Sequence, residues 1–137
     1  RSADATATVV VIAAHGALNF AAALSASAYL RIKNVPHRLL PPDAVQPGKF
    51  PDELANGAGF ACLCYLTAPS EARYAYVEKR VAARLPKARI LGIAWRDVDG
   101  ARSMLAPEHA LALLPAARHE SGLETPRSKP ELSVATR

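Results

Sequence analysis

Several polar or conformationally special residues lie at the ends of apolar segments of the chain or directly after them. These residues are His15, Gly16, Asn19, Tyr65, Thr67, Ser70, Trp95 and Asp97. A histidine in such a place can act as a general base or ligate a cofactor, and a glycine that opens a helix lets an anion approach the helix amino end. If the apolar segments are neighbouring parallel strands, these residues meet at one edge of a sheet and could bind a small ligand there.

None of these candidates belongs to a catalytic or nucleotide-binding motif. The turn AHGALN has one glycine, whereas dinucleotide-binding loops have three spaced glycines and triphosphate-binding loops end in Gly-Lys-Ser/Thr. Ser70 lies outside any GxSxG motif and is well placed to cap a helix. A lone histidine that ends a buried strand, such as His15, is more often structural than catalytic. We therefore predict no enzyme activity and treat the eight residues as candidate ligand-binding residues.

The cysteines and the other histidines give no pattern of metal ligands. Cys62 and Cys64 are two positions apart in an apolar segment, so on a strand they point to the same face. They are typical of small buried hydrophobic residues in a reducing compartment. His37, His109 and His119 are scattered and lack the spacing of a zinc site. We expect neither a metal nor a cofactor.

Length and composition bound the organisation and the partners. With 137 residues, half of them hydrophobic, the chain can bury one core. We expect a lead-in over 1–6, a single domain over 7–119 and a flexible tail over 120–137. The net charge of +5 is compatible with an anionic lipid surface. No nucleic-acid partner is expected, because aromatic residues make up only 6% of the chain and no basic run is interleaved with them.

Hydrophobic patterns predict four strands and three helices. The strands run over Thr8–Ala14, Val35–Leu40, Gly59–Leu66 and Ala88–Trp95, and the helices over Ala17–Lys33, Glu71–Leu85 and Pro107–His119. A further helical turn is expected around Pro51–Ala55. The uncharged stretch Ala5–Leu30 is long enough to span a membrane. Because its first part is β-branched and its second part is rich in alanine, a strand followed by a helix explains it better.

Two of the predicted helices differ in their surfaces. In Glu71–Leu85, apolar residues recur every three or four positions while Arg73 faces outward. Helix Ala17–Lys33 has almost no polar face. It therefore either contacts another chain or domain, or simply exposes small alanine surfaces to water.

The alternation of strands and helices is typical of an α/β fold with a doubly wound parallel sheet in three layers. With right-handed crossovers, the expected strand order is 2-1-3-4, as in flavodoxin-like folds. Such sheets bind ligands beyond the carboxyl ends of the strands, where the winding direction reverses. Here that point lies between the first and third strands.

Segment Ala61–Trp95 resembles the soluble carboxyl-terminal domain of bacterial permeases of the autoinducer-2 exporter family, in which a strand ending in Tyr-Leu precedes an Arg-rich helix, a Leu-Pro stop and a strand ending in Trp. The start, VVVIAAHGALNFAAA, is similar to that domain's opening strand and helix, but lacks the helix's acidic residues. The resemblance implies a domain on the cytoplasmic side of the bacterial inner membrane, following a membrane-spanning region. The absence of an initiating Met at Arg1 fits this expectation.

Three functions therefore remain open. The first is a non-catalytic cytoplasmic permease domain that acts in regulation, docking or oligomerisation. It would bind the transmembrane part or a second copy through helix 17–33, and it could sense a small ligand at the sheet edge. The second is a free-standing cofactor-binding or response module. His15-Gly16 is similar in position to the ligating histidine of cobalamin-binding domains, although Ala13 replaces their aspartate. The third is a small enzyme that uses His15.

Overall fold

The computed structural model describes residues 8–46 and 48–115. The expected lead-in over 1–6 and tail over 120–137 lie outside the described residues. No helix in the described part of the chain is long and apolar enough to cross a membrane. The stretch considered as a membrane span instead forms a strand followed by a helix, as the change in composition predicts.

The centre of the fold is a parallel sheet. Its strands are β1 (Thr8–Ala13), β2 (His37–Leu39), β3 (Ala58–Thr67), β4 (Arg89–Arg96) and β5 (Met104–Leu105). Their order is β2-β1-β3-β4-β5 and every neighbouring pair is parallel. This confirms the predicted flavodoxin-like α/β fold, with β5 added beyond the predicted order 2-1-3-4.

Strands β1 and β3 are buried on both faces because neither carries a charged residue. They pair side by side, with Val11 opposite Cys62 and Ile12 opposite Leu63. Successive residues of β1 enter different clusters: Val11 packs in one core cluster and Ile12 in the other. The sheet thus has an apolar core on each side, as expected for a sheet that is covered by helices.

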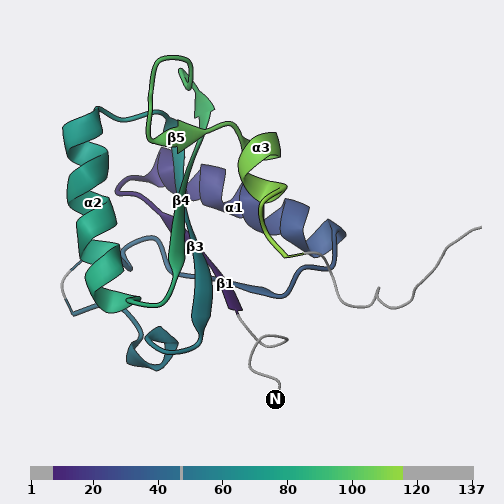
Figure 1. The fold of residues 1–137 in the computed structure, drawn as a ribbon, viewed down its shortest axis with the longest axis vertical. Coiled ribbons are helices and arrows are strands. Elements are labelled where there is room, and N and C mark those ends of the chain that lie inside the picture. Colours follow the sequence, from purple (N-terminus) through teal and green to yellow (C-terminus); the bar gives the residue numbers. More distant parts are fainter. Residues whose placement is uncertain (1–7, 47, 116–137) are drawn as a thin grey trace, which may run out of the picture.

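Helices cover both faces of the sheet, which confirms the three layers. Helices α1 (Ala17–Ile32) and α3 (Pro107–Leu111) lie on one face and α2 (Glu71–Arg84) on the other (Figure 1). The segment that contains the 3₁₀ turn η2 (Asp52–Leu54) packs on the same core as α2 through Phe50 and Leu54. This turn lies where a helical turn was expected.

Helix α2 forms where local signals predict it. The Ser70 Oγ accepts a hydrogen bond from the Arg73 N–H at 3.2 Å and so caps the helix. Tyr74 and Val81 are buried on its inner face. The Tyr74 ring covers Gly92 of β4 so closely that a Cβ there would lie 2.7 Å from Tyr74 Cε1. The glycine inside the predicted strand therefore marks close packing.

Helix α1 buries one side only. Its small inward residues, among them Ala23 and Ala26, pack on the sheet. On the opposite side Leu18 is 68% and Ile32 77% exposed, and Leu24 and Tyr29 are also exposed. The outer surface of α1 is therefore apolar and uncovered by the described residues.

Two predictions near the end of the chain are wrong. Strand β5 was missed, because two residues carry no periodic pattern; they become a strand only by pairing with Gly92 and Ile93. The last helix ends at Leu111 rather than His119. Pro115 has no N–H for the Leu111 carbonyl, which instead accepts from Leu114 N at 3.3 Å in a tighter turn. Residues 116–119 lie outside the described part.

Candidate functional site

A hollow of about 620 Å³ lies where β1 and β3 end and α2 begins. Four of the predicted site residues line it: His15, Asn19, Tyr65 and Thr67. The connection from β1 leads to an edge strand on one side, whereas that from β3 leads to the other side of the sheet. The hollow therefore lies at the expected switch point, between the first and third strands.

A second hollow, of about 430 Å³, adjoins the first at the amino end of α1. It shares His15, Asn19 and Thr67 with the larger hollow and is also lined by Gly16. Gly16 is the N-cap residue of α1 with a φ of 110°, in the region that favours glycine. This places a fifth predicted residue at the same edge.

Asn19 joins the two strand ends that form the site. Its Nδ2 donates a hydrogen bond to the His15 carbonyl at 2.7 Å. Its Oδ1 accepts one from the Leu66 N–H at 2.8 Å, across 47 positions of sequence. One side chain therefore holds the β1–α1 turn against the end of β3. Both polar atoms of Asn19 are used in these two hydrogen bonds, so its role at the site is structural first.

The amino end of α1 has unsatisfied donors. The first N–H groups of a helix have no intrahelical partner, and here no side chain caps them. The first turn also lacks an acidic residue that would complement the helix dipole. These N–H groups border the smaller hollow, where Gly16, Ala17 and Leu18 line the wall.

Tyr65 contributes an unpartnered hydroxyl. It lines the larger hollow, yet it is only 5% exposed. Its hydroxyl has no hydrogen-bond partner among the described residues. Burial raises the pKa of Tyr65 to about 12, while the nearby Arg73 lowers it and Glu78 raises it slightly. The group is therefore a neutral hydroxyl at neutral pH, directed toward α2.

Three predicted residues do not line either hollow. Ser70 caps α2. Trp95 packs partly buried against the core cluster on the α1 face, whereas Tyr65 and α2 lie on the opposite face. Asp97 follows β4 in a left-handed conformation with a φ of 59°. Strand alternation explains Trp95, because its side chain must point to the same face as Ile93.

Helix α2 supplies residues that sequence reasoning missed. Ala72, Arg73, Tyr76 and Val77 all line the larger hollow. Arg73 is exposed, as predicted, and borders the hollow as well. The short turn after β3 places the first two turns of α2 beside the strand end. The sequence does indicate that these residues share one face of α2, because Ala72 and Tyr76, like Arg73 and Val77, are four positions apart. It does not indicate that this face turns toward the sheet edge, which depends on how α2 packs.

Ser27 and His37 form a hydrogen-bonded pair outside the two hollows. Ser27 Oγ and His37 Nε2 lie 2.7 Å apart, and His37 Nδ1 contacts the Val35 carbonyl at 2.9 Å. Ser27 is only 2% exposed, and its contact with His37 links α1 to β2. Among the described residues, no three His, Cys, Asp or Glu side chains gather where they could hold a metal ion.

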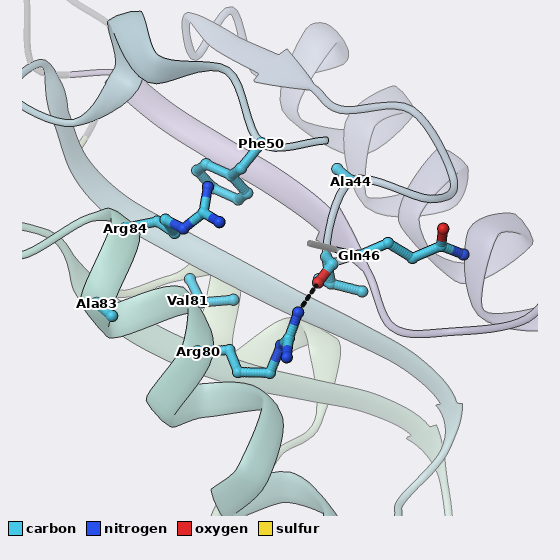
Figure 2. Close-up of a pocket in the computed structure, with 8 residues that line it drawn as sticks. Ala44, Gln46, Phe50, Arg80, Val81, Ala83 and Arg84 are labelled. Atoms are coloured by element: carbon cyan, nitrogen blue, oxygen red, sulfur yellow. Dashed lines mark hydrogen bonds between the residues drawn. The ribbon is translucent and has the colours of Figure 1, made fainter. Parts of the chain in front are cut away.

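Figure 2 shows another hollow, of about 230 Å³, between α2 and the segment after β2. Phe50 and Arg84 line it, and Arg80 Nη2 donates to the Val45 carbonyl at 3.0 Å. The Arg80 Nη1 donates to the Tyr76 hydroxyl at 3.2 Å. Because this guanidinium is already used to hold the segment against the helix, the hollow is a packing feature.

Comparison with known proteins yields no match: no protein-family model, curated protein or solved structure is similar to the chain.

Proposed function

We propose that this domain is a non-catalytic regulatory module that binds a small ligand at the carboxyl edge of its sheet, between β1 and β3. The observation that carries the proposal is the hollow of about 620 Å³ at that edge. Small-molecule sites usually measure roughly 300–1,000 Å³ and are mostly apolar with a few polar groups. The lining of this hollow, with Pro69 and Val77 beside Tyr65 and Arg73, fits that description.

The lining favours binding over catalysis. His15 supplies the imidazole of the larger hollow, and no carboxylate lies among the described lining residues to orient it. Catalytic bases usually act on a neighbouring nucleophile and are held by a third group. Tyr65 has a raised pKa, so its hydroxyl is not activated for attack. If the domain were instead an enzyme that uses His15, His15→Ala would abolish a detectable activity.

A pair of variants on α2 tests ligand binding. Ala72 lines the larger hollow, whereas Ala75 is exposed on the same helix and lines none of the hollows described above. We expect small aromatic fragments to shift the amide NMR signals around His15 and Thr67 in the wild type and in Ala75→Trp. Ala72→Trp fills the hollow and should abolish these shifts. Equal shifts in both variants, or none in the wild type, would remove the proposed site.

We further propose that the module belongs to a bacterial membrane permease and works on the cytoplasmic side of the inner membrane. Support comes from the resemblance of Ala61–Trp95 to permease domains and from the apolar outer surface of α1, where Leu18 and Ile32 are most exposed. Exposed apolar patches of this kind often mark interaction sites. The transmembrane part or a second copy of this chain is the proposed partner.

The charge at the end of α1 is compatible with a nearby membrane. Arg31 lies in the last turn and Lys33 at the carboxyl cap, and both are exposed. Basic groups beside an apolar surface suit an anionic lipid surface. The full reading frame provides the first test, since a permease requires several apolar segments of about 20 residues.

Sedimentation velocity tests the docking surface directly. Leu24→Glu places a charge on the outer surface of α1, and Ala82→Glu places one at an exposed position on α2. If two copies associate through α1, only Leu24→Glu should reduce the sedimentation coefficient at high protein concentration. A wild-type protein that stays monomeric would leave the transmembrane part as the partner, to be tested by co-purification with and without Leu24→Glu.

An alternative is a free-standing cofactor-binding module. It is favoured by His15, which is exposed at the mouth of the hollow and whose ring makes no hydrogen bond to another described residue. Cobalamin ligated by this imidazole would change its visible spectrum, and His15→Ala would prevent the change. An unchanged spectrum with cobalamin and with flavin would exclude this function.

A further inference from the structure

We infer that the ligand of this edge is a small organic anion, whose carboxylate or phosphate head lies between the amino end of α1 and Arg73 of α2, where the two hollows adjoin, and whose apolar body packs against α2 in the larger hollow. The inference rests on the proposed ligand-binding function and specifies the chemical class of the ligand.

The first argument is the excess of donors at the amino end of α1. This helix of 16 residues begins at Gly16 without a side-chain cap and without an acidic residue in its first turn. A Cβ added at Gly16 would meet only Asn19 Nδ2, at 4.0 Å, so the backbone is open to approach. Free N–H groups and the positive end of the dipole favour an anion here.

Tyr65 also points to a ligand, independently of the helix. The residue is only 5% exposed, and it lines the hollow that adjoins the amino end of α1. Buried hydroxyl groups almost always have a hydrogen-bond partner. The Tyr65 hydroxyl has none among the described residues. Its side chain packs in the core cluster on the α2 face, with its ring centroid 6.1 Å from that of Tyr74. A ligand oxygen in the hollow would supply the missing acceptor.

The third argument is the charge of the lining. Arg73 borders the larger hollow, and neither hollow has an Asp or Glu among its described lining residues. Arg73 is exposed and makes no ion pair with another described residue. An anion would therefore gain a cation without displacing a carboxylate from the lining, whereas a cationic ligand would meet like charge at Arg73.

The walls define the rest of the ligand. Pro69, Val77 and the Tyr76 ring give the larger hollow an apolar side. The Tyr76 ring is held by Arg80, whose guanidinium lies 5.6 Å from the ring centroid and donates to its hydroxyl at 3.2 Å. A planar or apolar body can pack against such a fixed ring. The site thus suits an organic acid better than a bare ion.

The probes for the test are benzoate, phenyl phosphate, inorganic phosphate, benzamide and benzylamine. Each is titrated into ¹⁵N-labelled protein at constant ionic strength, with the amides of Ala17, Leu18 and Thr67 as reporters. We expect benzoate or phenyl phosphate to bind at least about fivefold more tightly than benzamide, because hydrogen bonds to a charged acceptor are stronger than those to a neutral one. Benzylamine should be the weakest of the aromatic probes, and inorganic phosphate should be weaker than phenyl phosphate.

Three variants identify the groups. Arg73→Gln should weaken the binding of the aromatic anions severalfold, whereas Lys79→Gln removes the same charge from an exposed position of α2 that lines neither hollow and should not. Tyr65→Phe should weaken anion binding but leave the urea midpoint of the free protein unchanged or raised, because the hydroxyl has no partner to lose. A purely structural Tyr65 hydroxyl would lower that midpoint.

The outcomes separate the two proposals. If benzamide and benzylamine bind as tightly as the anions, or if Arg73→Gln and Lys79→Gln have equal effects, the inference about the anion is overturned while the ligand site stands. If no probe shifts these amides at millimolar concentration, the ligand-binding function fails and the inference fails with it.

Discussion

Replacement of Asn19 tests how the two strand ends are held together at the site. Asn19→Leu removes both hydrogen bonds of the side chain, to the His15 carbonyl and from the Leu66 N–H. The Leu66 N–H is left without its acceptor in a partly buried place, which costs about 1–3 kcal/mol, and the lost bond to His15 adds about 0.5–1.5 kcal/mol. Since Asn19 is itself partly exposed, we expect a total loss of roughly 2–3 kcal/mol.

Asn19→Asp separates the two bonds. Aspartate keeps an acceptor for the Leu66 N–H and adds a negative charge in the first turn of α1, which contributes about 0.3–1 kcal/mol. It loses the donor to His15 and sets a carboxylate near that carbonyl, at a cost of about 1 kcal/mol. These two effects nearly cancel, so Asn19→Asp should remain within roughly 1 kcal/mol of the wild type.

Urea unfolding followed by the fluorescence of Trp95 measures both variants. Ser25→Ala is the control, because Ser25 Oγ makes only an exposed bond of 3.2 Å to the Ala21 carbonyl within the same helix. We expect the control to lie within about 0.5 kcal/mol of the wild type, as for other surface substitutions. If Asn19→Leu cost less than Ser25→Ala, or if Asn19→Asp were as unstable as Asn19→Leu, Asn19 would not hold the two strand ends together.

Three further predictions concern packing, capping and the buried thiols. Gly92→Ala should lower the free energy of unfolding by about 1–3 kcal/mol, because its Cβ would lie 2.7 Å from the buried Tyr74 ring. Adding Tyr74→Leu to this variant should recover part of the loss. If the two substitutions instead lower the urea midpoint additively, the predicted contact is contradicted. Ser70→Ala should cost about 1 kcal/mol because it removes the cap of α2, and an unchanged thermal midpoint would argue against that cap. Burial raises the pKa of Cys62 from 9.0 to about 12 and that of Cys64 in the same direction. The folded protein therefore holds these protons after the unfolded chain has lost them. Stability should be fully present below about pH 9 and should fall as the pH rises, by about 1 kcal/mol per pH unit for Cys62 as the pH approaches 12. Alkaline unfolding curves should show a shallower decline for Cys62→Ala, and an identical slope would disprove the assignment.

The residues that the strand ends contribute to the candidate site can mostly be predicted from the sequence, but the residues that α2 contributes cannot. The carboxyl ends of β1 and β3 are marked by the change from apolar to polar residues, which is why His15 and Thr67 are found where they were predicted. Trp95 was placed at the same edge, yet strand alternation turns it to the α1 face. Arg73 carries a local pattern of a solvent-facing helix residue, and only the position of α2 over the sheet edge brings it to the hollow.

The layered architecture follows from the amino-acid pattern alone, because two charge-free strands and the helices between them have few ways to bury their apolar faces. The surroundings of the proposed ligand edge arise only when the elements pack: the bond from Leu66 to Asn19 across 47 positions, the hydroxyl of Tyr65 without a partner among the described residues and the uncapped start of α1. Strand and helix patterns arise from contacts between near neighbours in the chain, whereas the polarity and shape of a hollow depend on how separate elements pack, and no local period encodes that distance.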